Sequence, residues 1–398
     1  MQVIYDKNNQ KVPIYTWAPA NKIESGALDQ AKNLSNLPFA FKHVALMPDV
    51  HQGYGMPIGG VLATNDVVVP NAVGVDIGCG MCALPTNIHK LQLDKNILEK
   101  IVEEIYSKVP VGKKHFIKPK PLPSNLLQSF KDKNLKIAQQ ERDNIAYQIG
   151  TLGGGNHFIE IQYDENDRVW IMLHSGSRNL GKKVADYYNK LAIELNKKWK
   201  SNIPKHYQLN FLPIDSEEGR AYIDEMNFCI DFALENRKRM LERVVIAMEI
   251  YIPHLDVNFE EDMINIAHNY AALENHFGKN VLVHRKGATL ARKGKIGIIP
   301  GSQGTNSYIV EGLGNPKSFM SCSHGAGRIM SRSKAREILN LEEEKEKLES
   351  RNIVHRLETE KDLDEAPSAY KDIDEVMENQ KDLVKILHKL TPLAVVKG

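Results

Sequence analysis

Short apolar runs separated by glycine fill the first third of the chain. They read HVALMPDV, HQGYGMPIGGVLA and DVVVPNAVGVDIGCGMCAL. Apolar stretches of this length, bounded by glycine, proline and asparagine, are typical of buried strands joined by tight turns. We therefore expect a strand-rich N-terminal third.

The apolar spacing then alternates between strand and helix periods. NHFIEIQY and VWIML predict strands, HSGSRNLG predicts a turn, and KKVADYYNKLAIELNKKWK predicts a helix. We expect helices at 217–248, with a solvated charged face, and at 260–277, which would place His268 one turn after Ile264 on the apolar side. Further strands are predicted in VLVHRKGATLARKG and IGIIPGSQGTNSYIV, and charged helices after SCSHGAGR.

No internal repeat or long linker divides the 398 residues, so we expect a single α+β domain spanning 1–398. A lysine- and proline-rich stretch at 112–125, GKKHFIKPKPLPSN, predicts an exposed loop. Its basic side chains are suited to binding phosphates, but a merely solvated loop would have the same composition.

The overall charge excludes a global positive field. Lys and Arg number 52 against 50 Asp and Glu, a formal charge of +2, so nucleic-acid binding would need a local basic patch. The N-terminus lacks a basic region followed by an apolar run, and no window reaches the length of a membrane span, so we expect a cytoplasmic protein without a membrane partner. Four cysteines are too few for a disulfide framework, which leaves free thiols or a metal ligand.

Asp76 and Cys79 stand three residues apart in DIGCGM, among glycines that permit tight backbone paths. A carboxylate and a thiolate so placed can face one cation, and a thiolate can bridge two. A buried thiol beside a turn carboxylate is the alternative. Cys82 completes a CxxC, but no second CxxC exists, which disfavours zinc and redox roles.

Histidines occupy several further glycine- and serine-rich motifs. Strand alternation in GGGNHFIE sends Asn156 and Glu160 to one face and His157 to the other. His174 opens HSGSRNLG, whose backbone amides and Arg178 suit a phosphate or sulfate at the start of a helix. On spacing alone, His174 is equally well explained as a structural residue capping a turn, and His268 is better explained as a core histidine.

His324 precedes two glycines and Arg328 in SHGAGR. An imidazole beside backbone amides and a guanidinium suits nucleophilic attack at phosphorus. PGSQGTNS places Ser302 and Ser307 on a turn that could form a nucleotide rim. No Walker A sequence or lysine-nucleotidylation motif is present.

Together these motifs resemble the RtcB family of RNA-splicing ligases. The resemblance runs from PDVHQGYGMPIGG to the terminal VVKG, through DIGCGM, GGGNHFIE, HSGSRNLG, AHN, HRKGA, IPGSQGT and SHGAGR in order. It implies the family's α+β fold, in which mixed sheets flanked by helices enclose a catalytic cleft.

The resemblance also implies the site residues. Two manganese ions would be held by Asp76, Cys79, His157, His174 and His268, and His324 would carry guanylate. The GTP pocket would consist of Asn156, Glu160, Ser302, Ser307, Ala326, Gly327, Arg328, Tyr370 and Lys397. Glu160 and Lys397 would favour guanine over adenine. Arg178 and Lys286, with Arg328, would contact RNA phosphates.

The activity implied is an RNA ligase that uses GTP and Mn²⁺ to join 3′-phosphate or 2′,3′-cyclic phosphate ends to 5′-hydroxyl ends. One alternative is an end-processing cyclic phosphodiesterase, which the intact SHGAGR and Lys397 disfavour. Another is a non-catalytic binder of RNA or guanine nucleotides, which the complete set of metal ligands disfavours. The sequence identifies no activating protein partner.

Overall fold

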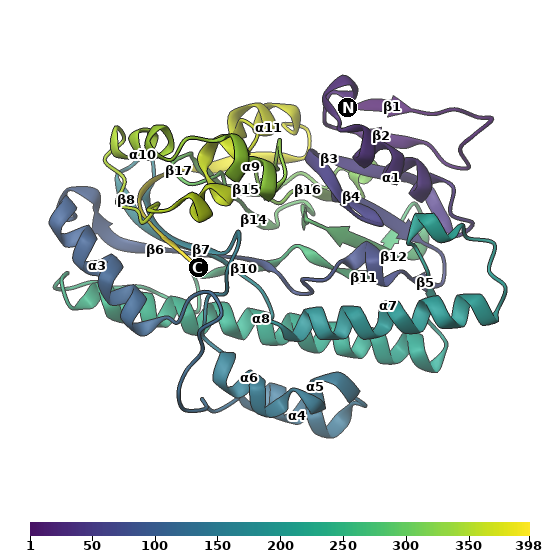
Figure 1. The fold of residues 1–398 in the computed structure, drawn as a ribbon, viewed down its shortest axis with the longest axis horizontal. Coiled ribbons are helices and arrows are strands. Elements are labelled where there is room, and N and C mark those ends of the chain that lie inside the picture. The colour runs from purple at the N-terminus through teal and green to yellow at the C-terminus, as the bar shows by residue number, and fades with distance from the viewer.

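A seven-stranded antiparallel sheet carries most of the site. In the computed structural model, which describes residues 1–398, its order is β10-β6-β8-β7-β17-β15-β14 (Figure 1). The strands are β6 (Gly80–His89), β7 (Phe158–Tyr163), β8 (Arg168–Ser175), β10 (Ile264–Ala267), β14 (Ile296–Ile299), β15 (Ser307–Gly312) and β17 (Val384–Lys397).

A six-stranded mixed sheet lies beside it, in the order β1-β2-β3-β4-β12-β11. Only β2 and β3 pair in parallel; the other neighbours are antiparallel. The strands are β1 (Gln2–Ile4), β2 (Ile14–Thr16), β3 (Ala40–Tyr54), β4 (Met56–Thr64), β11 (Asn269–His276) and β12 (Lys279–Lys286). Two strand pairs complete the β structure: β5 (Val67–Val68) with β9 (Leu212–Pro213), and β13 (Ala288–Leu290) with β16 (Ser321–Ser323).

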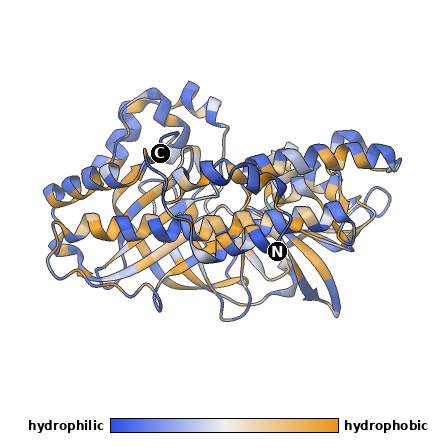
Figure 2. Cartoon of the chain, turned by 90° about the horizontal axis from the view of Figure 1, so that it is seen from below, coloured by the Kyte–Doolittle hydropathy of each residue, from blue (hydrophilic) through white to orange (hydrophobic).

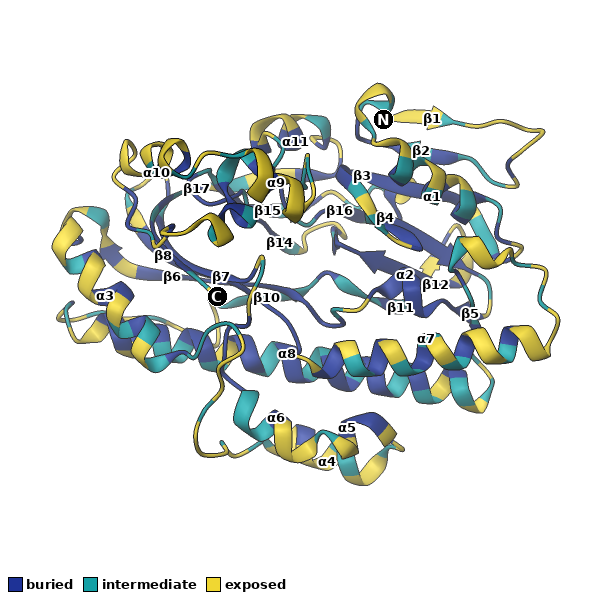
Figure 3. Cartoon of the chain, in the orientation of Figure 1, coloured by how far each residue is buried: buried dark blue, intermediate teal, exposed yellow.

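Two long helices, α7 (Leu180–Lys198) and α8 (Glu217–Glu249), run below the sheets in Figure 1. The Ser216 side chain caps α8 by accepting from the backbone nitrogen of Gly219, and Glu217 and Glu218 complement the helix dipole. Apolar and polar residues alternate along both helices (Figure 2), and the faces turned to the sheets are buried (Figure 3). Amphipathic packing therefore fixes both helices against the sheets.

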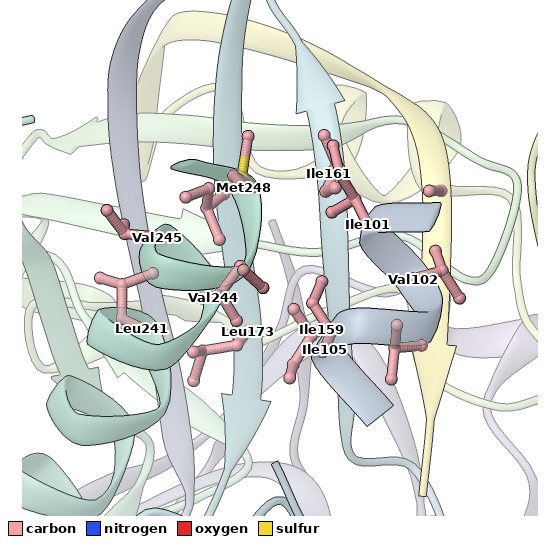
Figure 4. Packing of buried hydrophobic residues seen from close by; sticks show 14 of the residues in the cluster. Ile101, Val102, Ile105, Ile159, Ile161, Leu173, Leu241, Val244, Val245 and Met248 are labelled. Atoms are coloured by element: carbon pink, nitrogen blue, oxygen red, sulfur yellow. The ribbon is translucent and has the colours of Figure 1, made fainter. Parts of the chain in front are cut away.

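The largest core cluster lies between the seven-stranded sheet and two helices, α3 (Lys95–Lys108) and α8. In Figure 4, Ile101 and Ile105 of α3 and Val244 of α8 pack over Ile159 and Leu173 of β7 and β8. Burying aliphatic side chains of this size stabilises the fold by about 1.5–3 kcal/mol each. The strand ends that carry the site residues are thus held on a rigid support.

Shorter helices surround this body. They are α1 (Ser25–Ser35), α2 (Pro70–Val73), α4 (Ser124–Asp132), α5 (Lys136–Gln140), α6 (Arg142–Gln148), α9 (Arg332–Ile338), α10 (Leu341–Glu349) and α11 (Ile373–Asn379). Helices α4 to α6 lie below α8 in Figure 1, on the side away from the sheets. None of the helices combines the length and apolar composition needed to cross a membrane.

The α+β fold with mixed sheets flanked by helices is confirmed, but two local predictions were wrong. Residues 260–277 do not form a helix: they form β10 and β11, which pair with β6 and β12. The last residues after SCSHGAGR form the long strand β17 rather than a helix. Strand pairing overrides the local preference in both segments: β10 and β17 pair with strands distant in sequence, and β11 pairs with the neighbouring β12.

Candidate active site

Strand pairing brings the five predicted metal ligands together at adjacent ends of strands β6, β7, β8 and β10 of the seven-stranded sheet. Gly80, at the start of β6, pairs with Ser175 at the end of β8 and with Ala267 at the end of β10. Phe158, at the start of β7, pairs with His174. Asp76 and Cys79 directly precede β6, His157 precedes β7, His174 is in β8, and His268 follows β10. Residues spread over nearly two hundred positions therefore meet.

The side chains of these residues point toward one another. Cys79 Sγ lies 3.2 Å from His174 Nε2 and 3.5 Å from His157 Nε2. His174 Nε2 is 3.3 Å from His268 Nε2, and His157 Nε2 is 3.4 Å from Asp76 Oδ2. Two overlapping groups result, Cys79/His174/His268 and Asp76/Cys79/His157, with the ligand atoms of each within 4.8 Å of one another. Cys79 belongs to both.

The hydrogen bonds of the imidazoles fit metal ligation. His157 Nδ1 lies 3.0 Å from the Leu152 carbonyl, and His174 Nδ1 lies 3.1 Å from the Asn156 carbonyl. Because a carbonyl only accepts, each Nδ1 carries the proton and each Nε2 presents a lone pair. Burial, reinforced by neighbouring imidazoles, holds the pKa of His174 and of His268 well below the ordinary value, so both rings are neutral.

The thiol completes a donor set suited to two cations. Burial, followed by the charge of Asp76, raises the pKa of Cys79 well above its ordinary value. A cation reverses this preference, since a coordinating thiol loses its proton. A shared thiolate, three imidazoles and a carboxylate suit divalent transition metals such as zinc, cobalt or iron, and do not by themselves select one of them.

Arg237 of α8 holds the ligand-bearing strand ends together, although we predicted a solvated charged face for this helix. Its guanidinium is fully buried and donates from Nη1 to the carbonyls of Gly78 and Ser175 at 2.9 and 2.8 Å. Nε donates to Asn265 Oδ1 at 2.8 Å. The solvated-face prediction was therefore wrong at Arg237, because apolar periodicity cannot reveal a polar group buried against backbone carbonyls.

His324 stands beside this cluster. It follows β16, and its ring centroid is 4.8 Å from that of His268. Its Nδ1 lies 2.6 Å from Oδ2 of the fully buried Asp49 in β3, and the same oxygen accepts from the His324 backbone nitrogen at 3.1 Å. Sequence reasoning missed Asp49. The available signal was an acid between apolar residues in HVALMPDV.

A cleft of about 610 Å³ opens from the imidazoles of His174 and His324. Most of the predicted GTP-pocket residues line it: Asn156, Glu160, Ser302, Ala326, Gly327, Arg328, Tyr370 and Lys397. Ser307 lies behind the wall, where its hydroxyl accepts from Gln162 Nε2 at 3.1 Å. Gly327, at φ +76°, passes against the Asp49 backbone, where a Cβ would clash.

Neighbouring strands place a carboxyl group and an ammonium group in the cleft. Glu160 of β7 pairs with Val395 of β17, two residues before Lys397, so both side chains are on the same face. Burial raises the pKa of Glu160 to about 8, although Lys397 and the Gln162 amide act in the opposite direction. Burial lowers the pKa of Lys397.

Glu365, which sequence reasoning also missed, organises the far wall of the cleft. It accepts from the Tyr370 hydroxyl and, at 2.8 Å, from Arg332 Nε. Arg328 donates to the Tyr370 hydroxyl at 3.2 Å and lies over its ring. Nothing in the local pattern around Glu365 distinguishes it from its acidic neighbours in KDLDEAP.

Two of the three predicted phosphate contacts, Arg178 and Lys286, are held by hydrogen bonds within the protein and do not line the cleft. Arg178 donates to Thr151 Oγ1 at 2.8 Å and to the Gly112 carbonyl at 2.9 Å. Lys286 Nζ donates to the Tyr54 and Asn71 carbonyls at 2.6 and 3.1 Å and does not line the cleft. An RNA contact for either residue stays a prediction.

Comparison with known proteins identifies the family of this chain. The family model described as tRNA-splicing ligase RtcB matches residues 30–135 and 127–398. The RNA-splicing ligase RtcB of Escherichia coli K12 is 40% identical over 413 residues, covering 98% of each chain. The tRNA-splicing ligase RtcB of Nanoarchaeum equitans is 34% identical over 468 residues, 98% of this chain and 96% of that protein. That of Thermococcus kodakarensis is 31% identical over 469 residues, 99% of this chain and 96% of that protein. The chain therefore belongs to the RtcB family.

Proposed function

We propose that this protein is a GTP- and Mn²⁺-dependent RNA ligase. It joins an RNA 3′-phosphate, or a 2′,3′-cyclic phosphate after opening, to a 5′-hydroxyl end. One observation carries the proposal: a buried carboxylate orients His324 where a metal-ligand set and a cleft of about 610 Å³ adjoin. The names of the relatives support the RNA-ligase class, and the geometry supports the details.

His324 is the proposed nucleophile. The Asp49 carboxylate accepts a hydrogen bond from Nδ1–H, so the Nε2 lone pair is free to attack the α-phosphorus of GTP. A nitrogen–phosphorus bond forms, the bond to the bridging oxygen breaks, and pyrophosphate leaves. Attack by an RNA 3′-phosphate oxygen then moves the guanylate to RNA and frees the imidazole. The 5′-hydroxyl of the second strand finally attacks the activated phosphate, which forms the 3′,5′-phosphodiester and releases GMP.

The metal ligands would hold two cations beside this nucleophile. Asp76, Cys79, His157, His174 and His268 are the proposed ligands, and manganese bound there would neutralise phosphate oxygens and stabilise the developing charge. Arg237 keeps the ligand-bearing strand ends fixed, so the donors are preorganised before any cation binds.

Guanine selection rests on the walls of the cleft. The Glu160 carboxylate can accept from guanine N1–H and N2–H, and Lys397 can donate to O6. Adenine presents an acceptor and no amino group at the corresponding positions, so neither of these hydrogen bonds to Glu160 would form. A hydrogen bond to a charged group contributes about 1.5–3 kcal/mol, so losing both favours GTP.

Incubation with [α-³²P]GTP and MnCl₂ tests the guanylylation step. We expect acid-labile label on the wild type, none on His324→Ala, and label on His51→Ala, which removes another cleft imidazole. Joining of a 3′-phosphate RNA to a 5′-hydroxyl RNA tests the complete reaction. An unlabelled wild type that only opens 2′,3′-cyclic phosphates would instead establish an end-processing hydrolase.

A further inference from the structure

The basic loop at 113–120 is tethered directly to the metal-ligand cluster. Gly112 donates its backbone N–H to the Gly153 carbonyl at 2.8 Å, and its own carbonyl accepts from Arg178 at 2.9 Å. Gly153, at φ +91°, lies between Arg178 and His157, where a Cβ would come within 2.5 Å of His157 Nδ1. Gly153 therefore contacts both Gly112, at the start of this loop, and the proposed metal ligand His157.

The loop is held in a defined conformation on its inner side. Phe116 donates its backbone N–H to the Tyr147 carbonyl at 3.0 Å, and Lys120 donates to that of Ala146 at 2.7 Å. The Phe116 ring lies between two cations, with Lys120 Nζ and the Arg243 guanidinium each 4.7 Å from its centroid. These contacts anchor the loop to α6 and α8, so its outer side chains project from a fixed base.

The outer side of the loop carries lysine side chains that form no ion pair. Lys113, Lys114 and Lys118 are exposed, and none of them forms an ion pair with a carboxylate. Some surface lysines elsewhere, including Lys90, Lys108 and Lys182, do form such pairs, whereas others, including Lys197 and Lys198, do not. Ile117, among these lysines, is 96% exposed. An unpaired basic strip with an apolar tip lacks any structural partner in the fold.

We propose that residues 113–120 bind the backbone of the RNA strand whose end enters the metal-ligand cluster. The inference rests on the proposed RNA-ligase function and adds a site for the body of the substrate. The chain has a formal charge of only +2, so RNA affinity must come from a local concentration of cations such as this one. Lys113, Lys114 and Lys118 each neutralise a phosphate, while Phe116 and its flanking cations keep the strip in place.

The test compares two variants with the same change in net charge. The first carries Lys113→Glu, Lys114→Glu and Lys118→Glu. The matched control carries Lys197→Glu, Lys198→Glu and Lys200→Glu at and just beyond the C-terminal end of α7, about 27 Å along that helix from its start at a rise of about 1.5 Å per residue. Fluorescence anisotropy with a single-stranded RNA ending in a 3′-phosphate gives the affinity over a range of KCl concentrations.

The loop variant is expected to bind RNA about 10- to 100-fold more weakly near 0.1 M salt. Its log K against log[salt] slope should be shallower by about 2, since each phosphate contact on a single strand contributes about 0.7. Lys113→Arg, Lys114→Arg and Lys118→Arg together should retain binding. Ligation by the loop variant should be slowed at low RNA concentration and recover at saturating RNA.

Equal RNA affinity and salt slope in the loop variant and the wild type would refute the inference. An equal loss in the α7 control would also refute it, because net charge alone would then explain binding. Guanylate transfer from GTP involves no RNA and reports separately on the fold and the proposed function. A wild type that takes no guanylate overturns the proposed function, whatever the outcome of the binding comparison.

Discussion

Asp49 and His324 form a buried carboxylate–imidazole pair, with Oδ2 and Nδ1 2.6 Å apart. The same oxygen also accepts from the backbone nitrogen of His324, so the carboxylate fixes both the ring and the start of the SHGAGR loop. Oδ1 is buried and makes no hydrogen bond. Because a carboxylate only accepts, Nδ1 carries a proton, and in the neutral imidazole the lone pair is then on Nε2.

Asp49→Asn should slow guanylylation of His324 by about 10²-fold or more. An amide can donate to Nδ1 and so stabilise the tautomer with its proton on Nε2, and the same exchange in a catalytic triad costs about 10⁴ in rate. Single-turnover labelling with GTP measures the rate. Glu24→Gln is the control, since this cleft carboxylate accepts from the Gln52 backbone nitrogen instead of His324. An undiminished rate in Asp49→Asn would show that Asp49 does not set the tautomer.

Cys79→Ser and Cys82→Ser should separate metal binding from packing. Both thiols are buried, but Cys79 faces the imidazoles while Cys82 belongs to the apolar core. Removing a residue that hydrogen-bonds to a metal ligand typically lowers metal affinity about 10- to 100-fold. Removing the shared thiolate itself should therefore lower it at least about 10²-fold. Manganese titration calorimetry measures this. We expect Cys82→Ser to bind manganese normally and to unfold at lower temperature. Equal manganese affinities in the two variants would exclude Cys79 as a ligand.

Apolar periodicity correctly predicted elements whose conformation does not depend on pairing with another segment, such as long amphipathic helices. The helix at 217–248 matches α8 to within one residue because its apolar face repeats at the helical period over its whole length. The helix predicted at 260–277 is wrong, because the chain passes from one sheet to the other at His268, with β10 paired to β6 and β11 paired to β12. No property of INIAHNYAALENH alone indicates those two partners.

The site residues were predicted from the order of several motifs along the chain, which resembles that of a known family. The chemistry of each motif alone left alternatives open. Spacing alone left His268 as a core residue, and its position opposite His174 depends on the register of β6 with β10. Asp49 was missed because its partner, His324, lies 275 positions away in the sequence. Glu365 was missed because it stands in an acidic run, where the pattern does not single out the residue that accepts from Tyr370. Long-range pairing is the information that a single sequence lacks.

Glu274→Gln should destabilise the fold by about 3 kcal/mol at neutral pH. Glu274 is buried on β11 and accepts from Arg285 at 2.5 and 3.1 Å, and the substitution leaves that guanidinium buried without a counter-charge. Burial raises the pKa of Glu274, but hydrogen bonds from His276 and Arg285 outweigh it and bring the pKa to about 2. A lowered folded-state pKa gives stability that is present above the unfolded value of 4.5 and lost as pH falls toward 2.

The thermal unfolding midpoint of this variant should therefore approach that of the wild type as the pH falls from about 4.5 to about 2. Glu378→Gln is the control. Glu378 forms an exposed ion pair with Lys381, and its loss should leave the midpoint nearly unchanged. A constant gap between Glu274→Gln and the wild type across this pH range would contradict the assignment.

Glu160→Gln should abolish discrimination between GTP and ITP, which lacks the guanine N2 amino group. A hydrogen bond to a charged group contributes about 1.5–3 kcal/mol, so the wild type should bind GTP roughly 10- to 100-fold more tightly than ITP. The glutamine offers one acceptor oxygen in place of two, so the ratio in the variant should approach one. Competition binding with both nucleotides measures it, and ATP serves as the non-guanine reference. A wild type that binds GTP and ITP equally would remove Glu160 from guanine recognition.

Guanosine affinity should rise with pH because of the same carboxyl group. Burial brings the pKa of Glu160 to about 8, so the free protein carries a proton there at pH 6, whereas pairing with guanine N1–H and N2–H requires the ionised form. Binding must then expel a proton, and the affinity should increase about ten-fold per pH unit from pH 6 to about 8 and level off above it. Guanosine is the suitable probe because it has no phosphate to titrate, and Lys397 and Gln162 are the groups that face the carboxyl. Glu160→Gln should bind guanosine with little pH dependence over this range. If the wild type is equally insensitive to pH, then Glu160 is already ionised in the free protein and the cleft is more polar than its burial indicates.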